Sequence, residues 1–235
     1  VENTQSHSMK NKRIHKIILI AVVSLFYCNT LSLDYALDDR MLMMESEYTL
    51  DGSWNAVKKI LTTDTFTGYF GNDQTVVVGG RYRPLSQLTF LLEFKIFGKK
   101  IKEQIGDVHD FENVHNPDHE QFFAGSFLAF FSHLMNLVYF MLLCLLVYEV
   151  LAKLFRKYQG DKWFQSLAFL AAVLFALHPI HTEAVANAKG RDEIFAMLGA
   201  MTALWCCLQY VDTRKWWYLL LSLVAITFGL FSKEN

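Results

Sequence analysis

The sequence has almost no net charge, few cysteines and long stretches without any charged residue. A formal net charge of -1 over 235 residues gives no indication of a nucleic-acid partner. All four cysteines fall within apolar stretches, so they predict neither a disulfide framework nor a zinc site, and buried packing is their expected role. An internal repeat of about 34 residues, the period of tetratricopeptide arrays, is also lacking.

Apolar residues make up 53% of the chain and gather in five blocks. The blocks are Ile17–Leu33, Phe127–Ala152, Trp163–Leu177, Ile194–Val211 and Trp216–Phe231. Each approaches the roughly 20 residues that cross a bilayer, and five in one chain disfavour the alternative of long helices buried in a soluble protein. The sequence therefore predicts an all-α, polytopic integral membrane protein with about five transmembrane helices.

Basic residues precede the first block and separate the second from the third and the fourth from the fifth. By the positive-inside rule, residues 1–16 form a cytoplasmic tail, 17–33 the first transmembrane helix and 34–121 a large extracytoplasmic loop. Four further transmembrane helices follow in 122–235. We expect a retained first helix rather than a cleaved signal peptide, because no small-residue cleavage site follows Leu33. Any site on the outward-facing connections would then be periplasmic or lumenal, with the bacterial inner membrane favoured.

We also expect the chain to be the amino-terminal part of a longer polypeptide, since it starts at Val1 and stops directly after the polar "SKEN".

The large loop contains signals for short amphipathic helices. Ser53 is a predicted N-cap for a helix ending near Leu61, and Pro84 and Gly98 mark the start and end of a second helix. The second helix has Leu85, Leu88, Leu92 and Ile96 near one face, which predicts a helix lying along the membrane surface. Two arginines, Arg81 and Arg83, come just before it and could bind either lipid head groups or a substrate.

A polar stretch at 99–120 contains His109, Asp110, Glu112, His115, Asp118, His119 and Glu120. Its spacing matches no zinc or metalloprotease pattern, so we predict no metal site there, although a need for a divalent cation stays open.

Adjacent carboxylates follow the first transmembrane helix at Asp38 and Asp39. In a strand or loop they would point in opposite directions, so one could face a site while the other binds backbone or a cation. A carboxylate held at a site can act as a general base. The alternative is a hydrated membrane boundary without chemistry.

The connection around 178–192 crowds polar residues between two apolar blocks, where charge is costly. Pro179 disfavours helical geometry at His178, so His178 and His181 are not a metal-ligand pair. A short helix ending at Gly190 would align Glu183 with Asn187 and, if it continued, Arg191. Such a stripe suits a sugar phosphate, and a self-satisfied hydrogen-bond network is the alternative. The candidate substrate-binding residues are Arg81, Arg83, His133, His178, His181, Glu183, Arg191, Asp192, Lys233 and Glu234.

Five motifs follow one another along the chain: "DD" after the first span, "GRYRPLSQLTF", "SHLMNL", "LHPIHTEAVANAKGRDEIFAML" and "LFSKEN". In this order they resemble the membrane part of the tetratricopeptide-repeat-containing protein O-mannosyltransferase family, bacterial members included, within the glycosyltransferase C superfamily. The resemblance implies a membrane enzyme that moves a sugar from a polyprenyl- or dolichyl-phosphate carrier to a protein or glycan acceptor. By that analogy Asp38 or Asp39 is the catalytic base. Arg83, helped by Arg191 or Lys233, would hold the carrier phosphate.

Two other classes of function remain open. A transporter or flippase for a lipid-linked sugar predicts polar residues along a route through the bilayer midplane, whereas these spans are mostly apolar. A membrane scaffold whose loop binds a partner is the third hypothesis.

Overall fold

The protein is described by a computed structural model that covers residues 2–71, 81–97, 127–158 and 162–233. Within these ranges every regular element is helical, which confirms the predicted all-α class. The first half contains α1 (Glu2–Tyr27), η1 (Cys28–Ser32), α2 (Asp38–Met43), α3 (Glu47–Asp51), α4 (Trp54–Ile60), α5 (Thr67–Phe70) and α6 (Pro84–Phe97). The second half contains α9 (Phe127–Leu154), η3 (Arg156–Tyr158), η4 (Trp163–Gln165), α10 (Leu167–Leu177), α11 (His181–Ala186), η5 (Ala188–Gly190), α12 (Arg191–Thr213) and α13 (Trp217–Ser232).

Three helical segments are long and apolar enough to cross a membrane: Asn11–Ser32, Phe127–Leu154 and Ala188–Thr213. The other two predicted spans form apolar helices of 11 and 16 residues, α10 and α13, shorter than the roughly 20 residues that a bilayer requires. The structure thus supports an integral membrane protein with three candidate spans, and the count of five is not confirmed.

The shortness of α10 has a local cause at each end. Ser166 caps the helix by accepting a hydrogen bond from the Phe169 amide, which separates α10 from the 3-10 turn at Trp163. At the other end His178 is extended, with ψ 125°, as expected before Pro179.

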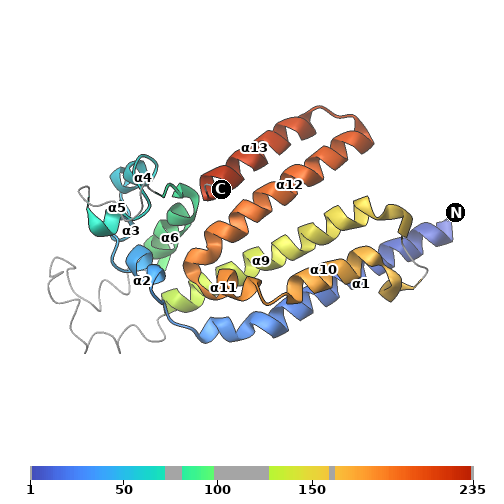
Figure 1. Ribbon diagram of the computed structural model, residues 1–235, viewed down its shortest axis with the longest axis horizontal. Coiled ribbons are helices and arrows are strands. Elements are labelled where there is room, and N and C mark those ends of the chain that lie inside the picture. The colour runs from blue at the N-terminus through green and yellow to red at the C-terminus, as the bar shows by residue number, and fades with distance from the viewer. Residues whose placement is uncertain (1, 72–80, 98–126, 159–161, 234–235) are drawn as a thin grey trace.

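The long helices run side by side along the long axis of the molecule (Figure 1). Helix α9 contacts α1, α10 and α12, and their shared core includes Leu19, Phe140, Cys144 and Ala172. All four cysteines are free; Cys144 and Cys206 are buried, as expected, whereas Cys28 and Cys207 are exposed.

Helices α12 and α13 form a tightly packed hairpin. A Cβ placed on Gly199 of α12 would lie 2.7 Å from the Gly229 Cα of α13, so only glycine allows this approach.

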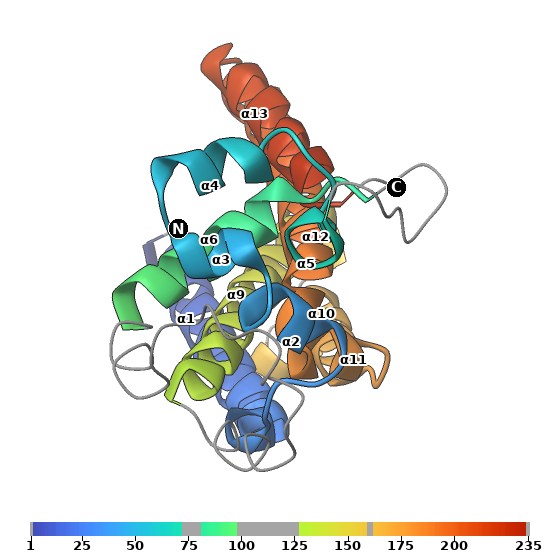
Figure 2. The same ribbon diagram turned by 90° about the vertical axis from the view of Figure 1, so that its left-hand side faces the viewer.

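The short helices of the predicted loop gather at one end of the long helices, as Figures 1 and 2 show. Ser53 caps α4 as predicted, accepting a hydrogen bond from the Ala56 amide at 3.2 Å, and Pro84 begins α6. A second hydrophobic core joins this group of short helices to the start of α9 through Phe90, Phe94 and Leu128.

The faces of α6 are arranged in an unusual way. Its polar residues Gln87 and Glu93 are 2% and 5% exposed, whereas Leu92 and Ile96 are 54% and 66% exposed. The buried face of α6 is therefore mixed, because Phe90, Leu91 and Phe94 are buried beside these polar residues. Leu92 and Ile96 of the predicted apolar stripe point outward together with Lys95.

Candidate functional site

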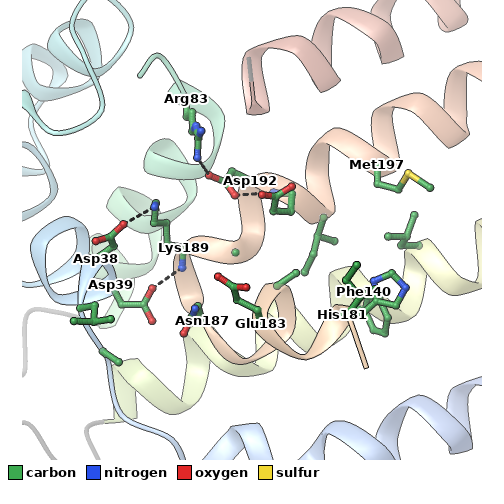
Figure 3. Close-up of a pocket in the computed structure, with 18 of the residues that line it drawn as sticks. Asp38, Asp39, Arg83, Phe140, His181, Glu183, Asn187, Lys189, Asp192 and Met197 are labelled. Carbon is green, nitrogen blue, oxygen red and sulfur yellow. Dashed lines mark hydrogen bonds and ion pairs between the residues drawn. The ribbon is translucent and has the colours of Figure 1, made fainter. Parts of the chain in front are cut away.

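A cavity of about 590 Å³ lies where α2, α11, η5 and the first turn of α12 meet α9 and α10. Its lining divides into two halves that Figure 3 separates clearly. Ionic side chains from α2, η5 and α12 gather at one end, together with Arg83 just before α6. At the other end Figure 3 shows Phe140 of α9 and Met197 of α12 near His181. Phe175 of α10 also lines the cavity, and its ring lies 6.4 Å from that of Phe140 and 4.4 Å from that of His181. The cavity can therefore hold a ligand with a polar head and an apolar tail.

Asp39 is buried, with 1% of its surface exposed, and binds backbone. Its carboxylate accepts hydrogen bonds from the amides of Ala188 at 2.9 Å and Lys189 at 2.7 Å. Burial raises the pKa of Asp39, and the hydrogen bonds from these two amides oppose that rise. Both oxygens are occupied by the chain itself, so Asp39 ties α2 to the turn between α11 and α12.

Asp38 is the more accessible member of the pair. Its carboxylate lies 2.5 Å from the Lys189 ammonium, with side-chain exposures of 42% and 19% respectively. The two aspartates begin a helix rather than the expected strand or loop, yet they still point to different partners: one binds backbone and the other a cation.

Two further ion pairs lie at the ionic end. Arg83 donates from Nη1 to the Asp192 carboxylate at 2.5 Å, with side chains 12% and 4% exposed. Lys233 contacts the carboxylate of Glu193, which lines the cavity. Lys233, just after α13, thus lies beside the cavity through Glu193 but is not one of its lining residues.

The helix predicted to continue to Gly190 stops earlier. Asn187 is extended, with φ -92° and ψ 130°, and separates α11 from the 3-10 turn η5. A Cβ on Gly190 would lie 2.4 Å from the Ala184 carbonyl oxygen, so the chain folds back closely here. Glu183 and Asn187 still line the same cavity, but the predicted extension of their stripe to Arg191 along one helix is wrong.

Arg191 turns away from the cavity and is fully buried. Its guanidinium group binds Glu93 and Thr89 of α6 and Asn136 and the Ser132 carbonyl of α9. These contacts place it in the protein interior and not against a ligand.

The remaining predicted residues are divided between the cavity and its surroundings. His181 and Glu183 line the cavity, and burial, aided by nearby His178, lowers the pKa of His181. His178 is exposed outside the lining, where its Nδ1 accepts a hydrogen bond from the Ile180 amide.

Arg81 and His133 also lie outside the lining. Arg81 stacks over Phe66, and His133 is buried in α9 near the Tyr35 ring. Glu234 and the polar stretch at 99–120 lie outside the described residues.

Lys189 was not predicted as a partner of Asp38, although the sequence places this charged residue in the same polar connection, between Asn187 and Arg191. The assumption of one continuous helix obscured it, because a helical stripe through Glu183 leaves Lys189 on another face. Among the described residues, no group of three histidine, cysteine, aspartate or glutamate side chains could hold a metal ion.

The chain is similar to several proteins named protein O-mannosyl-transferase. It is 26% identical to TMTC2 of Homo sapiens over 206 residues, which cover 86% of this chain and 19% of the relative. It is 31% identical to TMTC1 of Homo sapiens over 164 residues, covering 66% of this chain and 15% of the relative. Against Tmtc2 of Drosophila melanogaster it is 26% identical over 245 residues, covering 97% and 22%.

These similarities support the resemblance seen in the sequence, and the matched part of the chain spans 15% to 22% of the length of these relatives. No family model matches the chain, and no solved structure matches it.

Proposed function

We propose that this chain is the membrane part of a glycosyltransferase that moves a sugar, mannose or a close analogue, from a polyprenyl- or dolichyl-phosphate carrier to an extracytoplasmic acceptor. A protein hydroxyl is the favoured acceptor. One observation carries the proposal: a single cavity joins an ionic end to an apolar wall, in a chain similar to protein O-mannosyl-transferases. The volume of about 590 Å³ lies within the range of roughly 300–1,000 Å³ typical of small-ligand sites.

The proposed donor fits the two halves of the cavity. Its isoprenoid chain would contact the apolar wall around Phe140, in the candidate membrane span Phe127–Leu154, and Phe175, in the shorter apolar helix α10. Its phosphate would bind Arg83 and Lys189 at the ionic end. The leaving group, polyprenyl phosphate, departs as an anion, so positioned cations assist its departure and no general acid is needed.

Asp38 is the better candidate for the general base. Its carboxylate is accessible from the cavity, whereas both oxygens of Asp39 accept backbone amides. In the proposed step the acceptor hydroxyl loses its proton to Asp38, its oxygen bonds to the anomeric carbon, and the bond from that carbon to the phosphate oxygen breaks. The products are the glycosylated acceptor and polyprenyl phosphate.

Both cations already pair with carboxylates, Lys189 with Asp38 and Arg83 with Asp192. A donor phosphate would compete for Lys189 and so release Asp38 from its ion pair. Donor binding would thereby free Asp38 to accept the proton of the acceptor hydroxyl. Before the donor binds, the ion pair with Lys189 would make Asp38 a weaker base.

The test uses the full-length polypeptide in detergent, with radiolabelled polyprenyl-phosphate sugars and serine- and threonine-rich peptides. We expect label in the peptide with wild type and a loss of about 10²- to 10⁴-fold with Asp38→Asn, the range of a general base. The matched control is Glu47→Gln, which changes a carboxylate on α3 that is 71% exposed and outside the cavity lining. Donor binding without transfer to any peptide would instead favour a transporter of lipid-linked sugars, and full transfer by Asp38→Asn would remove the proposed base.

A further inference from the structure

Two ion pairs of opposite polarity join α6 to the start of α12. In the first, α6 is preceded by the cation Arg83 and α12 supplies the anion Asp192. In the second, α6 supplies the anion Glu93 and α12 the cation Arg191. Arg83 and Glu93 are ten residues apart, roughly 15 Å along a helix, so the two pairs hold α6 to the start of α12 at two separate points.

The second pair is isolated from the cavity and from solvent. The side chains of Arg191 and Glu93 are 0% and 6% exposed, and neither lines the cavity. Glu93 uses its other carboxylate oxygen to accept a hydrogen bond from Ser132 of α9 at 2.6 Å. The Arg191 guanidinium also lies 4.6 Å from the Phe90 ring centroid. This buried ion pair, hydrogen-bonded to its surroundings, forms a rigid junction of α6, α9 and α12.

The junction continues to the turn that carries Lys189. Asn136 accepts a hydrogen bond from Nε of Arg191 at 2.8 Å and donates to the carbonyls of Asn187 at 2.7 Å and Ala188 at 3.2 Å. On the opposite side Asp39 accepts the two amides of the same turn. The turn is therefore clamped between Asn136 and Asp39.

We propose that Glu93 is a positioning residue: through Arg191 and Asn136 it holds the 187–190 turn so that Lys189 meets Asp38. This inference rests on the proposed function for its catalytic consequence, but the clamp itself can be tested without activity. Displacing reacting groups by about 1 Å can cost on the order of 10²-fold in rate, so a clamp of this kind would matter without touching substrate.

The experiment measures two quantities on the full-length protein: hydrogen exchange of the Ala188 and Lys189 amides, and kcat for sugar transfer. Glu93→Gln leaves Arg191 buried without its counter-charge and could fail to fold, so the double variant Glu93→Gln with Arg191→Met is made beside it. Removing both charges of a buried pair is often tolerated. Glu93→Asp retains the charge and serves as the conservative rescue.

A matched control exists at the opposite end of the same helices. Asp212 of α12 pairs with Lys153 of α9 at 2.6 Å and with Arg156 at 3.0 Å, so Lys153→Met with Asp212→Asn removes the charge contacts of α12 at this end. This control should leave both amide exchange in the turn and kcat at wild-type values.

We expect exchange of the two amides to rise about tenfold or more in the folded double variant, as local opening becomes easier. We also expect kcat to fall on the order of 10- to 10²-fold, with a smaller change in donor KM because Arg83 and the apolar wall remain. Glu93→Asp should recover part of both losses.

A folded double variant with wild-type exchange would overturn the clamp, and faster exchange with unchanged kcat would overturn its positioning role. If wild type itself transfers no sugar, the proposed function fails, and the exchange measurement still decides whether the Glu93–Arg191 pair holds the turn.

Discussion

Replacing each of the two adjacent aspartates by asparagine should give opposite results for stability and activity. Asp39 accepts two backbone amides in a buried setting, and hydrogen bonds to a charged group contribute about 1.5–3 kcal/mol each. In Asp39→Asn one oxygen remains to accept one amide, while the new NH₂ group would face the other N–H donor. Relief from burying a charge offsets part of the loss, since burial raises the pKa of Asp39. We expect a net loss of about 2–3 kcal/mol in the free energy of unfolding.

Asp38→Asn should behave differently, because it removes only a partly exposed ion pair with Lys189. Such pairs contribute about 0–1 kcal/mol. At about 2–4 °C per kcal/mol for a chain of this size, Asp39→Asn should lower the unfolding midpoint by roughly 4–12 °C and Asp38→Asn by less than about 4 °C. Thermal unfolding in detergent, measured beside sugar transfer, tests both values.

The stability of wild type should also depend on pH. A carboxyl whose folded pKa is raised binds more protons in the folded state than in the unfolded state. Stability should therefore fall as pH rises from about 3.9, the ordinary aspartate pKa, through the raised value of Asp39. Asp39→Asn should lack this contribution. Wild-type stability in Asp39→Asn, with transfer lost there and kept in Asp38→Asn, would refute the assignment of Asp38 as base and Asp39 as anchor.

Three smaller predictions concern packing, protonation and backbone strain. Gly199→Ala should cost about 1–3 kcal/mol in thermal unfolding because its Cβ meets backbone at 2.7 Å, and Gly229→Ala, with 3.2 Å to its nearest atom, should cost clearly less. Burial and His178 lower the pKa of His181, so His181 should reduce wild-type stability as pH drops below about 6.5. His181→Phe should remove this contribution from unfolding midpoints measured between about pH 8 and 5. Leu37 has φ 47° and is 84% exposed, so in Leu37→Gly a release of about 1–3 kcal/mol of strain should offset the glycine entropy cost of roughly 1 kcal/mol; a midpoint several degrees lower would contradict this.

The helical architecture could be predicted because its signals are local. Apolar block length predicted the long helices, Ser53 predicted the start of α4, and Pro84 predicted the start of α6. Span length was less predictable, since a cap at Ser166 and the extended residue before Pro179 shorten α10 within an otherwise apolar block.

The site was predicted in part, and the errors arise where the chain leaves a regular helix. Asp38, Arg83, Glu183 and Asp192 do line one cavity, although they come from distant parts of the sequence. The different partners of the two aspartates depend on the extended residue Asn187, because it brings two backbone amides towards Asp39. A break of this kind depends on tertiary contacts, which periodicity does not record.

Helix α6 shows why polarity alone misplaces residues at a membrane boundary. On a soluble protein, Glu93 would belong to the solvated face and Leu92 to the core. Here Leu92 is exposed and Glu93 is buried against Arg191. If the surroundings of α6 are hydrocarbon, an outward leucine costs nothing, and an inward carboxylate is stable once it is paired and hydrogen-bonded. Arg191 was likewise predicted to bind a phosphate at the surface of the site, but its guanidinium group is buried between α6 and α9. There it holds together the segments that carry Arg83 and Lys189, the residues proposed to bind the phosphate.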